Sequence, residues 1–159
     1  MILLNNISGY THYDLEGEKN FEEIIQEFKQ ICFQVASDIG GEIIDWHEPD
    51  IRMHYPYAHI RILGEEIYVL HNGVYPFIAF SQNNEILDLQ FVDHSLLSQA
   101  FQKYYRVLRV AELIEPLIIK KIGDTVFIKN PNELHEMELK YVRRFSAKTV
   151  GMIVFNYWD

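Results

Sequence analysis

Five runs of alternating apolar and polar residues lie between residues 42 and 92, and most of them are separated only by short turns. Successive side chains of a strand point to opposite faces of a sheet, so a period of two predicts strands with one apolar and one polar face. The predicted strands are Glu42–His47, Tyr57–Leu63, Glu66–His71, Val74–Phe80 and Glu85–Val92. A parallel neighbour needs a crossover of roughly a dozen residues or more, so these short turns predict antiparallel pairing.

Asn72–Gly73 is the strongest turn signal in this region, because both residue types tolerate the positive φ angles of a type I′ hairpin turn. Leu63–Gly64–Glu65 and Gln82–Asn83–Asn84 mark the neighbouring reversals. The runs and turns together predict a meander of four to six strands as the core of the fold.

An amphipathic helix is predicted ahead of the sheet, over residues 20–39. Its apolar positions recur at the i, i+3, i+4, i+7 spacing of one buried stripe. They are Phe21, Ile24, Ile25, Phe28, Ile31, Cys32, Val35 and Ile39. Asn20 with Glu23 three residues later predicts a capping box at the start, and Gly40 predicts a left-handed stop at the end.

Further elements are predicted in the second half of the chain. They are a helix starting at an Asp93 cap, a helical turn over Val110–Glu115, a hairpin of Pro116–Ile122 with Thr125–Lys129, a helix capped by Asn130, and a last strand over Thr149–Trp158. The sequence has no linker or repeat, so we expect one domain spanning residues 1–159. The predicted fold class is α+β, an antiparallel sheet with helices packed on one face.

Charge is distributed unevenly along the chain. The net charge is −9, and residues 1–50 carry 11 acids and 2 bases, residues 51–100 carry 5 and 2, and residues 101–159 carry 7 and 10. The three segments therefore have net charges of −9, −3 and +3. A general nucleic-acid binder needs a concentrated basic surface, so the acidic balance argues against that class. It suits a basic partner, or it serves only the solubility of the protein.

The compartment is predicted from cysteine usage and hydropathy. Cys32 is the only cysteine, so no internal disulfide can form, and the N-terminal residues lack the basic and long apolar regions of a signal peptide. No apolar run approaches the roughly 18 residues of a membrane span. We expect a cytoplasmic protein that is not in the membrane.

Sequence motifs for cofactors and covalent catalysis are missing. The chain has no Walker loop, no GxGxxG and no Gly-x-Ser-x-Gly, and Cys32 falls in the apolar stripe of the predicted helix. The seven histidines are His12, His47, His54, His59, His71, His94 and His135. No two of them have the i, i+4 or i, i+2 spacing of paired metal ligands, so we expect neither a cofactor nor a metal site.

One group of polar residues nevertheless forms a candidate ligand site. His47, Glu48 and His54 lie in a stretch dense in imidazole, carboxylate and aromatic side chains that has no clear strand or helix pattern. In the next predicted strand, Tyr57, His59 and Arg61 alternate with apolar residues and share one face. Asp88 and Gln90 are predicted on the same polar face of the sheet, which could equally be an ordinary solvated face.

Two hypotheses of function follow. The preferred one is a non-enzymatic protein-binding domain that engages a basic protein partner through acids of its N-terminal third, as small acidic proteins such as bacterial immunity proteins do. Those acids are Glu16, Glu18, Glu22, Glu23 and Glu27. The alternative is a small enzyme or ligand-binding domain that uses the His47–Arg61 region through general acid–base chemistry or a bound divalent metal.

Overall fold

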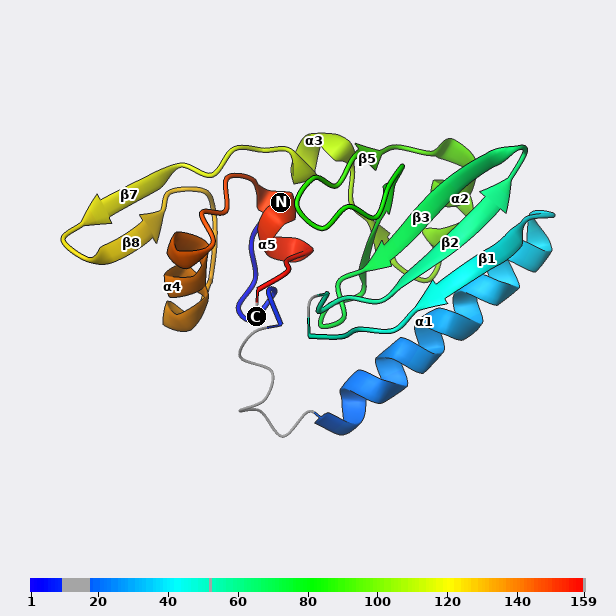
Figure 1. Cartoon of the computed structure of the whole chain (residues 1–159), viewed down its shortest axis with the longest axis horizontal. Helices are drawn as coiled ribbons and strands as arrows, with labels where there is room; N and C mark the ends of the chain where they lie inside the picture. The colour runs from blue at the N-terminus through cyan, green and yellow to red at the C-terminus, as the bar shows by residue number, and fades with distance from the viewer. Residues whose placement is uncertain (10–17, 52, 159) are drawn as a thin grey trace.

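The structure is a computed structural model of the chain, and it describes residues 1–9, 18–51 and 53–158, without the side chains of residues 18–20. The fold is α+β, as predicted (Figure 1). The main sheet contains β1 Glu42–His47, β2 Tyr57–Ile62, β3 Glu65–His71, β4 Phe77–Ser81, β5 Phe91–Val92 and β6 Arg106–Val107. The first five form the predicted antiparallel meander in chain order, and β6 pairs with β4 in parallel.

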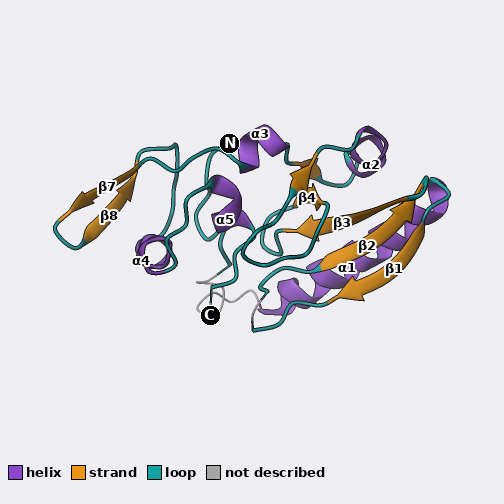
Figure 2. Ribbon diagram, turned by 45° about the horizontal axis from the view of Figure 1, so that its top comes forward, coloured by secondary structure: helices purple, strands orange, loops and turns teal. Residues whose placement is uncertain are grey.

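The remaining elements are five helices and a separate hairpin. The helices are α1 Glu18–Asp38, α2 Ser95–Phe101, α3 Val110–Leu113, α4 Glu136–Arg144 and α5 Val150–Val154, and the hairpin is β7 Ile119–Ile122 with β8 Thr125–Ile128. Figure 2 shows α1 beside the main sheet, and α4 beside the hairpin at the opposite end of the molecule. No helix in the described part of the chain is both long and apolar enough to cross a membrane.

One face of the sheet is buried by α1 and α2. Alternate residues of β2 and β3 supply its apolar side chains, among them Ile60 and Val69. Phe28 of α1 is fully buried in this cluster and lies within ring-contact distance of Trp46, His71 and Tyr105. The predicted helix therefore packs through its predicted stripe, although it begins at Glu18, so that Asn20 lies inside it and is not its cap.

The other face of the sheet is covered only at the end near the β3–β4 turn. There Tyr57, Leu70 and Ala79 belong to a second apolar cluster, which includes Tyr55 and Trp158 and is built largely by the C-terminal half of the chain. Because this cover stops part of the way along β2 and β3, the rest of the face stays polar.

Buried polar groups join this second cluster to the sheet. Asn72 is predicted to form a two-residue turn with Gly73, but the connection to β4 runs over residues 72–76. The two-residue turn does not form because the Asn72 amide instead donates to the carbonyl oxygens of Ile7 and Val154, each at 2.8 Å. The fully buried Glu138 carboxylate similarly accepts from the backbone N–H groups of Asn6 (2.9 Å) and Ser8 (3.0 Å).

Several predicted boundaries are wrong because polar side chains have other partners. Asn130 bonds the backbone of Ile118 (2.7 Å) instead of capping a helix, and His135 caps α4. His94 caps α2 in place of Asp93, whose carboxylate accepts from Val110 N–H.

The predicted C-terminal strand is wrong for a different reason. Residues 150–154 form the helix α5, because a short run that is buried on every side has no periodicity that could distinguish a strand from a helix.

A pair of phenylalanines on α1 tests the packing of this helix. Phe28→Ala should lower the free energy of unfolding by about 3 to 5 kcal/mol, because it removes a fully buried ring from the core. Phe33→Ala is the control on the same helix, and the 50 % exposure of Phe33 predicts a change of less than about 1 kcal/mol. Urea titration measures both values. Equal losses in the two variants would contradict the orientation of α1.

The buried His71 predicts a pH effect. Burial lowers the pKa of its imidazole from 6.5 to about 3, and its Nδ1 accepts a hydrogen bond from Gly73 N–H at 2.8 Å. Between these two pH values the unfolded chain binds the proton and the folded chain does not, so the contribution of His71 to stability falls as the pH falls, by up to about 1.4 kcal/mol per pH unit. The ring resonances of His71 should stay constant in NMR spectra from pH 8 to pH 5. A titration midpoint near 6.5 would contradict its burial.

Candidate functional site

The predicted acids of the first helix lie on its outward face. Glu22, Glu23 and Glu27 are all exposed on α1. Glu16 lies outside the described residues, and Glu18 is the first residue of α1, with a side chain that is not described. Three of the five predicted acids are thus placed on one solvent-facing surface.

The charge on this surface is almost entirely negative. Among the described side chains of α1, those of residues 21–38, the only base is Lys29, which is half-buried with its ammonium 5.7 Å from the centre of the Trp46 ring. The exposed Glu42 and Asp45 of β1 pair in register with Arg61 and His59 of β2, on the sheet face that α1 does not cover, and so belong to a different surface. We call the exposed acids of α1 the acidic end, defined as Glu22, Glu23, Glu27 and Asp38.

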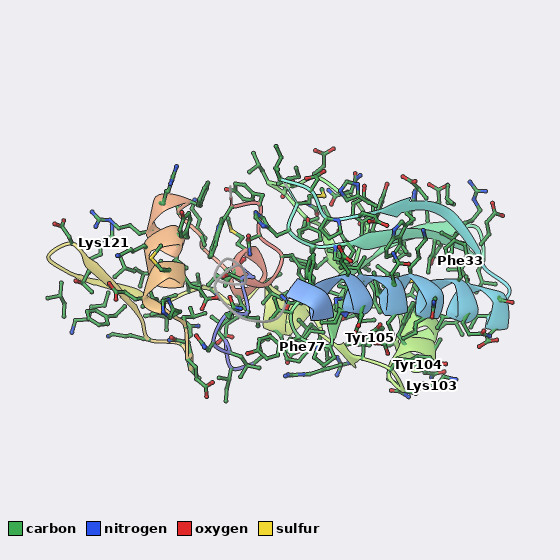
Figure 3. All side chains as sticks on the ribbon, turned by 90° about the horizontal axis from the view of Figure 1, so that it is seen from below. Phe33, Phe77, Lys103, Tyr104, Tyr105 and Lys121 are labelled. Carbon is green, nitrogen blue, oxygen red and sulfur yellow. The ribbon has the colours of Figure 1, made fainter. Side chains whose placement is uncertain are left out.

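Phe33 is an exposed aromatic residue on the same helix, and Figure 3 labels it. Gln26 and Glu22 precede it by seven and eleven residues, close to two and three helical turns, so the three side chains share one stripe of α1. Aromatic side chains are enriched among the few residues that carry most of the binding energy of protein interfaces. Sequence reasoning missed Phe33, although its helical position next to the acids and off the apolar stripe was a usable signal.

The free edge of the sheet at β1 is protected against pairing with other strands. β1 is the outer strand, and its register with β2 shifts between Ile43 and Asp45. A bulge and charged side chains are both devices that prevent an edge strand from pairing with another chain. The outer edge of β1 is therefore poorly suited to pairing with a further strand.

The alternative site forms a polar array on the uncovered part of the sheet. Tyr57, His59 and Arg61 share one face of β2, as predicted. The register places Asp45 and Tyr68 on either side of His59, and Glu66 beside Arg61. Predicting these neighbours requires the registers of both the β1–β2 and the β2–β3 pairs.

Imidazole and phenol rings stack in two pairs across this array. The centres of the His59 and Tyr68 rings are 4.1 Å apart, and those of His47 and Tyr57 are 4.7 Å apart. The Nε2 atom of His47 lies 3.3 Å from a carboxylate oxygen of Asp50. The corresponding atom of His59 lies 3.5 Å from Glu66. Both nitrogens are within ion-pair distance of a carboxylate, yet neither makes an aligned hydrogen bond.

The environment of Tyr68 favours the protonated phenol. Burial raises the pKa of its phenol, and the nearby Tyr57 hydroxyl and the Glu66 and Asp45 carboxylates raise it further. Arg61 is paired with Glu66 at 2.9 Å and lies 3.7 Å from Glu42. The array is therefore a set of paired and stacked groups, and its exposed ion pairs each contribute at most about 1 kcal/mol to stability.

The structure does not bring the whole predicted ligand site together. His54 lies in the β1–β2 loop, where its carbonyl faces Gly73, and Glu48 accepts a long hydrogen bond from the Trp46 indole at 3.5 Å. Asp88 and Gln90 are not on the sheet, because Asn83 holds residues 83–90 as a loop through bonds to Asp88 O (2.9 Å) and Gln90 N–H (3.0 Å).

Four of the open hollows on the described surface are lined by other residues than His47, His54 and His59. Within residues 1–9, 18–51 and 53–158, no three His, Cys, Asp or Glu side chains are grouped closely enough to hold a metal ion. Comparison with models of known protein families, with curated proteins and with solved structures finds no match.

The two histidine–carboxylate pairs predict that the protein holds no stoichiometric zinc. Each pair offers two ligands, whereas a zinc site needs three or four in tetrahedral geometry. Elemental analysis after exhaustive dialysis should give far less than one zinc per chain. A value near one that falls on His47→Ala or His59→Ala would overturn this prediction and place a metal on the sheet face.

Proposed function

We propose that the protein is a non-enzymatic protein-binding domain whose acidic end engages a basic protein partner. One observation carries this proposal. The outward face of α1 exposes Glu22, Glu23 and Glu27, and residues 21–38 expose no basic side chain beside them. Carboxylates of one sign on one surface attract a basic partner over the Debye length, about 8 to 10 Å at physiological salt, and so speed its association.

Phe33 complements the acids as an apolar contact. Binding energy in protein interfaces concentrates in a few aromatic or arginine side chains that become desolvated, while a charged rim sets orientation and rate. Phe33 is half-exposed and shares a stripe with Glu22 and Gln26. The proposed interface therefore has Phe33 as its anchor and the exposed acids of α1 as its rim.

An immunity or inhibitor protein is the class of binder that we propose. Such a protein covers a basic surface of its target with carboxylates, and the target of this chain would then carry Lys and Arg where the acidic end carries acids. We place the activity in the cytoplasm, where the lone buried thiol of Cys32 stays reduced.

One observation supports the alternative function, a ligand-binding site on the sheet face. The Nε2 atoms of His47 and His59 are buried without an aligned hydrogen bond, and unsatisfied buried polar atoms are rare in native structures. A ligand on the polar array would supply the missing partners. Partner capture by a His47→Ala/His59→Ala variant distinguishes the two functions, because only the sheet-face site depends on these imidazoles.

Affinity capture tests the main proposal. The purified chain should capture a basic protein in stoichiometric amount from a lysate of its source organism, and stopped-flow measurement with that purified partner gives the association rate. Electrostatic steering predicts a rate at low salt that falls steeply as salt is added. Glu22→Lys/Glu27→Lys should lower the low-salt rate by roughly tenfold or more, since steering contributes about 10- to 1,000-fold.

A matched control separates position from total charge. Glu85→Lys/Glu133→Lys makes the same change in net charge at exposed acids away from α1, and should leave the association rate nearly unchanged. Phe33→Ala should raise the dissociation rate instead, because it removes a short-range contact. The proposal fails if no basic protein is captured, or if both charge variants associate at the wild-type rate with a flat salt response.

A further inference from the structure

The hairpin β7–β8 lies at the opposite end of the molecule from α1, and Figure 3 labels Lys121 there and Phe33 on α1. One side of the hairpin is covered, because Val126 and Ile128 are buried and α4 packs against β8. The register pairs Lys120 with Phe127 and Ile122 with Thr125, so these four side chains share the side that faces away from Val126 and Ile128.

This uncovered side exposes large apolar residues between lysines. Ile118, Ile122 and Phe127 are 57 %, 58 % and 45 % exposed. Lys120 and Lys129 alternate with them on the same side, by the period of two. We call these five residues the hairpin face. A small surface that exposes three large apolar side chains to this extent is typical of an interaction site.

The edge of β7 is open to a further strand. Bonded and non-bonded rungs alternate along an antiparallel pair. Lys129 N–H donates to Ile118 O at 2.8 Å, so the bonded rungs fall on Ile118, Lys120 and Ile122. The backbone groups of Ile119 and Lys121 then point to the outer edge, where no strand of the described chain pairs with β7. The outer edge of β8 is partly closed, because Ile128 O accepts from the Asn132 amide at 2.8 Å.

A second copy of the chain is a poor occupant of this edge. Antiparallel pairing of β7 with β7 of another copy would bring Lys120 and Lys121 close to the same lysines of the partner, and like charges across a strand pair are destabilising. Lysines on an edge strand protect against such self-pairing. The same lysines attract carboxylates, so charge complementarity selects an acidic partner.

We propose that β7 binds an extended acidic segment of a partner protein, which adds to the hairpin as a third strand. Its backbone would pair with Ile119 and Lys121, its apolar side chains would cover Ile118 and Ile122, and its carboxylates would lie near Lys120. In this mode of recognition the backbone bonds supply affinity and the alternate side chains supply specificity. The site is distinct from the acidic end and takes a ligand of opposite charge.

Selection from random peptides displayed on phage, against the immobilised full-length chain, tests the proposal. Enriched peptides should alternate Asp or Glu with apolar residues. Fluorescence anisotropy with the best synthetic peptide then gives its affinity for each variant. Lys120→Glu/Lys129→Glu should weaken binding by roughly tenfold or more, because it places carboxylates opposite carboxylates.

A proline variant tests strand addition itself. Lys121→Pro removes an outward N–H that the hairpin does not use, and proline is tolerated on an edge strand at such a position. It should abolish peptide binding while Lys121→Ala retains most of it, with unchanged urea unfolding in both. Lys140→Glu/Lys148→Glu, which reverses two charges off the hairpin face, and Glu22→Lys/Glu27→Lys should bind the peptide with nearly wild-type affinity.

Three outcomes would overturn the proposal. One is the absence of any enriched peptide, or enrichment of peptides without acids. The second is equal binding by the Lys121→Pro and Lys121→Ala variants. The third is that no peptide binds, while the chain binds phosphatidylserine vesicles or self-associates with increasing concentration in sedimentation. In that case the Lys120→Glu/Lys129→Glu variant would lose the vesicle binding or the self-association.

Discussion

The alternation of side chains along β2 and β3 is the constraint on which both layers of the molecule depend. One set, including Ile60 and Val69, is buried under α1 and α2. The other set is apolar at Tyr57 and Leu70, where the C-terminal half of the chain covers it, and polar from His59 onward. A shift of one residue in register would exchange the two sets and expose both cores.

This arrangement turns a charge gradient along the chain into a separation in space. The acidic N-terminal segment folds into α1 and β1, while most of the basic C-terminal segment folds into the β7–β8 hairpin and α4 at the far end (Figure 1). Opposite charges at a distance neither neutralise each other nor stabilise the fold to a large extent, because salt screens them beyond about 10 Å. We propose above that each end binds a partner of opposite charge.

The sequence predicts the meander, the long helix and the face shared by Tyr57, His59 and Arg61, because each rests on a local period. The prediction fails where a polar side chain bonds residues distant in sequence. Asn72 reaches Ile7 and Val154, and Asn130 reaches Ile118, and no local pattern contains such partners. The same difference holds for the candidate site. The exposed acids of α1 can be predicted from one helical period, whereas the neighbours of His59 depend on the register of three strands.

Carboxylate footprinting of the complex tests the central claim most directly, because it detects the acidic side chains themselves. Carbodiimide coupling of glycine ethyl ester, followed by mass spectrometry, should modify Glu22, Glu23 and Glu27 in the free chain and leave them largely unmodified in the complex with the basic partner. Glu85 and Glu133, exposed elsewhere, should react equally in both states. Unchanged modification of the three α1 acids, with protection elsewhere, would show that the partner binds at another surface.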